Sequence, residues 1–92
     1  MTDKIPPQAI DIEAAVLGAM MIDNNCLNIA MAKLFSDVFY KESNSLIFQA
    51  IEKLYDKGQP VDILTVVDQM KKDGSLEQAG GAYYITGLTN NV

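Results

Sequence analysis

The stretch EAAVLGAMMID, residues 13–23, contains nine consecutive apolar residues. On a helix of about 3.6 residues per turn these side chains point in every direction, whereas a surface helix keeps one face polar. The run is much shorter than the roughly 20 apolar residues that cross a bilayer, and Asp11 and Asp23 flank it closely. We therefore predict a buried helix over about Ala9–Ile22 and no association with a membrane.

Residues suited to helix caps delimit the next elements. Asp23 suits the N-cap of a helix over about Asn24–Leu34, whose apolar positions recur every three or four residues. The connector SDVFYKES that follows predicts one turn of tight helix. Ser43 suits the N-cap of a helix over about Asn44–Lys57, and Gly58 suits its end.

The last third of the chain predicts two further helices. Asp62 suits the N-cap of a helix over about Ile63–Lys72, and a single helical turn can follow over Ser75–Gln78. A pair of glycines then breaks the chain before a final helix over about Ala82–Asn90.

These elements together predict an all-α fold. No segment alternates apolar and polar residues for long enough to form a strand. With 92 residues, 49% of them apolar, the chain suffices for one domain with one core. We expect a compact bundle of about five to six short helices over residues 8–92, preceded by a flexible lead-in at residues 1–7.

The helix predicted around residue 50 has an unusually wide apolar face. Its apolar positions cover roughly 200° at 100° per residue, whereas one core contact needs about 100°. This excess indicates a second contact surface, and aromatic side chains are enriched where proteins bind one another. The candidate interaction residues are the aromatic side chains that a small core does not fully enclose: Tyr40, Phe48, Tyr55 and Tyr83. Ordinary packing inside the domain is the alternative for each.

The charge distribution argues against direct binding of nucleic acid. The net charge is −5, and all seven basic residues are lysines, with no arginine or histidine. Neutralisation of phosphates drives nucleic-acid affinity, and arginine is the usual reader of guanine. Lys71 and Lys72 lie three and four residues after Asp68, so a solvated ion-pair cluster explains them. A single cysteine, Cys26, excludes an internal disulfide and fits a reducing compartment.

No pattern in the chain predicts catalysis. Zinc sites need clustered Cys or His, which the chain lacks, and DNNCLN does not have the residues of a calcium loop. Serine nucleophiles lack a histidine base. Glu52 and Asp56 form a carboxylate pair on the predicted polar face, where water should leave both pKa values unperturbed. We predict that this chain alone is not an enzyme and that it holds no metal or cofactor.

Several fragments resemble one protein family when they are taken together. They are PPQAIDIEAAVLGAMMID, the FY of VFYKESNSLIF, PVDILTVVDQM and LEQAGGAYYITGL. Their order and spacing are similar to those of the N-terminal domain of replicative DNA helicases of the DnaB type, over about Pro6–Val92. The sequence departs from the family pattern at Asn44, where a histidine is common.

The resemblance implies a protein-docking role in bacterial DNA replication. In such helicases this head domain is followed by a helical hairpin, a linker and a RecA-like ATPase domain, and the last of these binds ATP and Mg²⁺. Six chains form a ring around single-stranded DNA, and the head domains form a collar, arranged as a trimer of dimers, on which the primase C-terminal domain docks. The expected location is the cytoplasm. We expect the 92-residue chain alone to be a monomer or a weak dimer.

Two alternative functions remain open at the level of the sequence. One is a helix-turn-helix nucleic-acid reader, in which ILTVVDQMKK would present Asp68, Gln69, Lys71 and Lys72. The other is an unrelated acidic helical adaptor.

Overall fold

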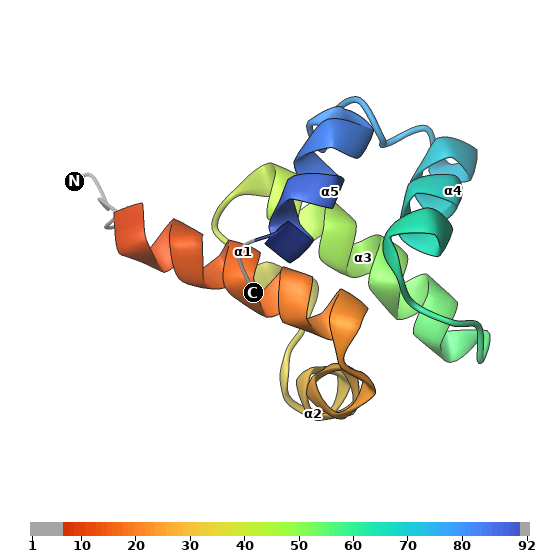
Figure 1. Cartoon of the computed structure of the whole chain (residues 1–92), viewed down its shortest axis with the longest axis horizontal. Coiled ribbons are helices and arrows are strands. Elements are labelled where there is room, and N and C mark those ends of the chain that lie inside the picture. The colour runs from red at the N-terminus through yellow and green to blue at the C-terminus, as the bar shows by residue number, and fades with distance from the viewer. Residues whose placement is uncertain (1–6, 91–92) are drawn as a thin grey trace.

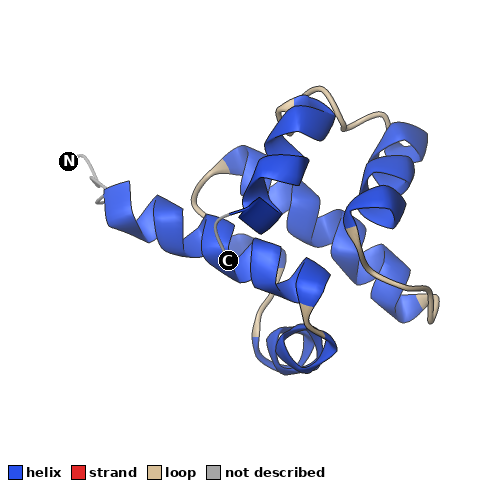
Figure 2. Ribbon diagram, viewed as in Figure 1, coloured by secondary structure: helices blue, strands red, loops and turns tan. Residues whose placement is uncertain are grey.

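The computed structural model describes residues 7–90, and every regular element within that range is helical (Figures 1 and 2). This confirms the prediction of an all-α fold. Of the flexible lead-in predicted at residues 1–7, residues 1–6 lie outside the described residues, whereas Pro7 already belongs to α1, so the prediction is wrong for that residue. The elements in chain order are α1 (Pro7–Ile22), α2 (Asn24–Lys33), the short 3₁₀ helix η1 (Ser36–Val38), α3 (Glu42–Asp56), α4 (Ile63–Asp73) and α5 (Gly81–Asn90).

Two of the predicted helix caps form as expected. The Asp23 carboxylate accepts a hydrogen bond from the backbone N–H of Asn25 at 2.8 Å, at the start of α2. Asp62 and Thr65 form a reciprocal capping box at the start of α4, with N···O distances of 2.9 and 3.0 Å. Each cap satisfies backbone donors that have no partner within the helix.

The predicted start of α3 is wrong. The helix begins at Glu42, so Ser43 lies inside its first turn, where its hydroxyl is buried without a hydrogen-bond partner. The N-cap is Lys41, which makes no capping bond with its own side chain. The Glu13 carboxylate of α1 instead accepts hydrogen bonds from the backbone N–H groups of Tyr40 and Lys41. A residue far away in the sequence therefore caps this helix.

Smaller differences occur at other helix ends. α1 begins at Pro7 rather than Ala9, and proline is favoured in a first turn because its missing N–H has no partner there. At the single helical turn predicted over Ser75–Gln78, the Ala79 N–H donates to the Ser75 carbonyl at 3.1 Å, so one turn forms without growing into a regular helix. α5 then begins at Gly81 rather than Ala82. Gly80 has φ +94°, and a Cβ there would lie 2.8 Å from the Cβ of Tyr84, so this turn requires glycine.

α3 lies at the centre of the domain, in contact with α1, α4 and η1. Its wide apolar face is explained by these neighbours, because Ile47, Phe48, Ala50, Ile51 and Leu54 are all buried. These buried positions account for most of the width, but Tyr55 at the edge of the face is 38% exposed, so a second contact surface there remains a prediction.

α1 packs against α2 on one side and α5 on the other, and it also contacts α3 (Figure 1). Leu17, Met20 and Met21 point into the core. The burial is incomplete, because Ile12 and Ile22 are each about three-fifths exposed. No helix within the described residues is long and apolar enough to cross a membrane.

Candidate protein interaction surface

The four aromatic residues singled out from the sequence have very different exposures. Tyr83 is 93% exposed, Tyr40 is 59% exposed and Tyr55 is 38% exposed, whereas Phe48 is fully buried. Phe48 packs against Phe39 with 5.0 Å between the ring centroids. The prediction that Phe48 contacts a partner is wrong, because this ring lies in the core. That Tyr40, Tyr55 and Tyr83 contact partner proteins remains a prediction.

A network of polar side chains holds the Tyr84 ring and the backbone of Tyr40. Glu13 on α1 accepts a hydrogen bond from the Asn44 side-chain amide at 3.0 Å, and the Asn44 carbonyl accepts one from the Tyr84 hydroxyl at 2.6 Å. The Lys41 ammonium lies 4.5 Å from the centre of the Tyr84 ring. The network joins α1, α3 and α5, and the bond from Glu13 to the Tyr40 backbone anchors that residue as well.

A cleft of about 520 Å³ lies between α1 and α5, next to this network. Tyr83 stands at its edge, and Lys41 and Asp11 contribute one charge of each sign to its lining. Its remaining lining residues are Ile10, Ala14, Gly80, Tyr84, Gly87 and Leu88. Among the candidate tyrosines, only Tyr83 lines this cleft; Tyr55 instead hydrogen-bonds Asn28 of α2 at 3.0 Å.

Three exposed apolar side chains form part of the surface that the sequence reasoning missed. Leu64 on α4 is 75% exposed, Ile29 on α2 is 59% exposed and Phe35 is 57% exposed. The exposure of Leu64 could have been predicted from the helical period of α4, because the buried residues Val66 and Met70 lie on the opposite face of the helix. For Phe35 there is no such signal, because it lies in a connector.

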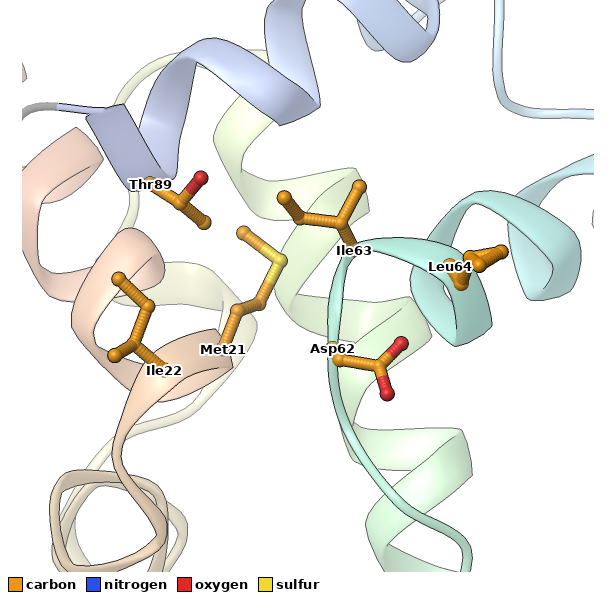
Figure 3. Close-up of a pocket in the computed structure, with 6 residues that line it drawn as sticks. All are labelled: Met21, Ile22, Asp62, Ile63, Leu64 and Thr89. Carbon is orange, nitrogen blue, oxygen red and sulfur yellow. The ribbon is translucent and has the colours of Figure 1, made fainter.

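Leu64 borders a hollow of about 390 Å³ between the end of α1 and the start of α4 (Figure 3). Met21 and Ile63 point toward the middle of this hollow from opposite sides, and Thr89 of α5 closes it above. A separate, almost wholly apolar groove of about 280 Å³ lies between α1 and α2, lined in part by Val16, Ala19 and Ile29. The apolar surface of the domain thus occurs on more than one face.

The pKa values of two carboxyl groups, those of Glu52 and Asp73, are shifted from their ordinary values. Burial, together with the charge of Asp56, raises the pKa of the Glu52 carboxyl, so the prediction of an unperturbed pair is wrong for Glu52. Burial opposes ionisation of Asp73, but hydrogen bonds from Lys53 and Gln69 and the charges of Lys53 and Lys57 lower the pKa of the Asp73 carboxyl overall. Lys53 and Asp73 form an ion pair at 3.0 Å between α3 and α4.

The surface of α4 does not fit a reader of nucleic acid. Gln69, predicted to be exposed, is only 5% exposed, and Lys72 pairs with Asp68 at 3.2 Å as predicted from their spacing. The outward side of the helix therefore presents Leu64 and an acid beside its lysines. Within residues 7–90 no group of three or more Cys, His, Asp or Glu side chains is placed to hold a metal ion.

Comparison with known proteins gives a consistent result. Residues 5–92 match the family described as "DnaB-like helicase N terminal domain". The chain is 40% identical over 89 residues to "Replicative DNA helicase DnaB" of Rhodothermus marinus, and 39% identical over 92 residues to "Replicative DNA helicase DnaC" of Bacillus subtilis (strain 168). The match covers 97% and 100% of this chain but only 10% and 20% of those relatives.

A solved structure shows the same fold. The crystal structure of the N-terminal domain of DnaB helicase from Mycobacterium tuberculosis superposes with a TM-score of 0.88 at 32% sequence identity. The superposition covers 96% of this chain and 61% of that one.

Proposed function

Since the chain belongs to the DnaB-like helicase N-terminal domain family, we propose that it acts as the collar of a bacterial replicative helicase, where it helps to assemble the ring and docks primase. The whole protein would be an ATP-dependent hexameric helicase in the cytoplasm. ATP and Mg²⁺ would bind a separate ATPase domain, and the head would contribute contacts between proteins rather than chemistry.

The distribution of exposed apolar side chains supports this proposal. A head domain in a ring has to contact its neighbours and a second protein at the same time. Large exposed apolar residues lie on α2, on α4 and beside the α1–α5 cleft, at Ile29, Leu64 and Tyr83. Each of these residues lines a groove or cleft together with other apolar side chains. Contiguous exposed apolar surface marks interaction sites, and separate faces suit separate partners.

We assign primase docking to the α1–α5 cleft. Tyr83 places a nearly fully exposed aromatic ring at the cleft, and the polar network holds the neighbouring Tyr84 and Lys41 in place. Tyrosine is among the residues enriched at protein interfaces and at their binding hot spots.

A titration of the isotope-labelled chain with the cognate primase C-terminal domain tests this assignment. We expect NMR shifts to cluster at α1 and α5, and Tyr83→Ala to weaken binding at least tenfold. Tyr55→Ala removes a less exposed tyrosine that lies outside the cleft, so it is the matched control and should bind normally. Undiminished binding by Tyr83→Ala would exclude this cleft, and absence of any binding would exclude primase docking by the head alone.

The absence of ATP chemistry in this chain is a separate expectation. A phosphate-release assay on the purified 92 residues should stay at background with and without single-stranded DNA. Hydrolysis above background would contradict it.

A further inference from the structure

The almost wholly apolar groove between α1 and α2, of about 280 Å³, has a wall from each helix. Val16 and Ala19 of α1 line it from one side, and Cys26, Ile29 and Lys33 of α2 line it from the other. The three residues of α2 are three and four positions apart, so they form one continuous stripe along the face of that helix.

This groove lies at an edge of the domain that the other helices leave open. α2 packs mainly on α1, and Figure 1 shows it below α1, away from α4 and α5. Ile29 is 59% exposed, and Lys33 is exposed as well. Contiguous exposed apolar surface of this kind marks a place where another molecule binds.

Lys33 gives the groove a positive charge, although the whole chain has a net charge of −5. Its side chain forms no ion pair or hydrogen bond within residues 7–90. The nearby acids Asp23 and Asp37 do not line the groove, and Glu13 on α1 is occupied by the network at the start of α3. Electrostatic complementarity therefore favours an occupant that carries a carboxylate beside apolar side chains.

The surroundings of the groove favour a helix as that occupant. The described residues contain no strand, so no sheet edge is present there to pair with an extended segment, whereas the side chains of a helix pack readily between two others. The stripe from Cys26 to Lys33 spans about 10 Å, or two helical turns. Lys33 lies in the last turn of α2, so an antiparallel helix would bring its first turn, where an acid is favoured, next to Lys33.

A second copy of this chain does not supply an apolar ridge of this length. On the helices away from the groove the large exposed apolar side chains occur singly: Tyr55 on α3, Leu64 on α4 and Tyr83 on α5. One side chain cannot fill a stripe of two turns. The occupant is therefore a helix of a different protein.

We propose that the α1–α2 groove binds an amphipathic helix of a partner protein, which lies antiparallel to α2. An acidic residue of the partner helix pairs with Lys33, and apolar residues four and seven positions later pack beside Ile29 and Cys26. The inference goes beyond the proposed function, because primase is assigned to the α1–α5 cleft on another face of α1.

An NMR titration of the isotope-labelled chain with a synthetic peptide tests the site. The peptide is rich in alanine and about 15 residues long, which allows a helix to form in water. It carries a glutamate followed four and seven residues later by leucines, and in a charge-swapped peptide a lysine replaces the glutamate. We expect shifts to cluster at the groove residues of α1 and α2, and the glutamate peptide to bind at least fivefold more tightly than the charge-swapped one.

Matched variants separate the charge from the apolar contact. Lys33→Glu should reverse the preference, so that the charge-swapped peptide binds more tightly, and Ile29→Glu should weaken the glutamate peptide at least tenfold. Lys71→Glu and Leu64→Glu make the same changes on α4 and should bind within twofold of the wild type. Circular dichroism should show unchanged helix content in all four variants, because all four residues are exposed.

The orientation has its own measurement. A spin label at the amino end of the peptide should broaden the amide signals near Lys33, and a label at its carboxyl end should broaden those near Cys26. The opposite pattern would overturn the antiparallel arrangement.

Absence of binding, equal binding of the two peptides, or shifts confined to other helices would overturn the site. Shifts of the groove residues that depended on the concentration of the chain alone would show that a second copy fills the groove, and would overturn its assignment to another protein. Primase docking has its readout at α1 and α5 with a different ligand, so failure of either titration leaves the other standing.

Discussion

Two polar side chains are buried within the described residues, Asn44 and Gln69, and they hold together different parts of the domain. Asn44 joins α3 to α1 and α5 through Glu13 and Tyr84. Gln69 joins α4 to α3, since its carbonyl accepts a hydrogen bond from Lys57 at 3.2 Å and its amide donates one to Asp73 at 3.0 Å. Each amide uses both its donor and its acceptor.

The two junctions differ in what happens when they are broken. The partners of Asn44 are themselves half-buried, so a lost bond leaves a carboxylate and a phenol poorly solvated. The partners of Gln69, Lys57 and Asp73, are both exposed, so they can bind water. Unsatisfied buried groups cost about 1–3 kcal/mol each, whereas exposed ion pairs contribute about 0–1 kcal/mol. The α1–α3–α5 junction should therefore contribute more to the stability of the head than the α3–α4 junction.

Substitution of Asn44 should have the largest effect. Asn44→Ala removes both bonds and leaves a small cavity, so we expect a loss of about 2–4 kcal/mol in the free energy of unfolding. Urea denaturation followed by circular dichroism measures this. Asn44→Asp sharpens the test, because a carboxylate next to Glu13 should destabilise more at pH 7 than at pH 4. A loss below about 1 kcal/mol for Asn44→Ala would show that the junction is not structurally important.

Glu13→Gln should have the second-largest effect, a loss of about 2 kcal/mol in the free energy of unfolding. The carboxylate accepts bonds from two backbone N–H groups and from Asn44, and an amide nitrogen in place of one oxygen would face a donor. Because Glu13 also caps α3, hydrogen exchange at the first turn of that helix should quicken in the variant. Glu42→Gln is the control, since Glu42 lies in the same first turn and is exposed.

Gln69→Ala should lower the free energy of unfolding by about 1–2 kcal/mol, which is less than the loss expected for Asn44→Ala. The side chain is buried, but Lys57 and Asp73 can turn to water when it is removed. Urea denaturation of the two alanine variants under identical conditions makes the comparison directly. Equal losses of unfolding free energy in the two variants would mean that the solvent exposure of the hydrogen-bond partners does not affect the cost of removing the amide.

Asp73→Asn should cost at most about 1 kcal/mol at pH 7. The pKa of the Asp73 carboxyl lies below its ordinary value of 3.8 in the folded protein, so its ionised form favours folding. That contribution is complete above the ordinary value and is lost as the pH falls through the lowered pKa. Unfolding curves of the variant and the wild type should therefore differ at pH 7 and converge in strong acid.

Glu52→Gln should have the smallest effect on the free energy of unfolding, and it should stabilise the domain rather than destabilise it. Burial and the charge of Asp56 raise the pKa of the Glu52 carboxyl above its ordinary value of 4.5, so ionisation disfavours the folded state. The variant should be slightly more stable than the wild type at pH 7 and equal to it below pH 4.5. Thermal melts across this pH range measure the difference, and a variant that was less stable at pH 7 would contradict it.

Local rules were sufficient where a helix end depends on nearby residues. Asp23 and Asp62 cap their helices as predicted, because a cap needs only a short side chain within about three residues of the N–H groups that it binds. The all-α class followed in the same way, since the three- and four-residue spacing of apolar positions is local. The family followed from fragments spread over most of the chain, and the comparisons confirm it.

Only the tertiary structure decided matters that depend on distant partners. Ser43 was expected to cap α3, but Glu13 does so from 27 and 28 residues away in the sequence. Phe48 was expected at an interface, but α3 is enclosed from several sides, and a single helix cannot show how many neighbours surround it. Gln69 was expected in solvent, but its hydrogen bonds to Lys57 and Asp73 make its burial possible. Helix positions are determined by local chemistry, whereas burial and long-range capping are properties of the assembled core.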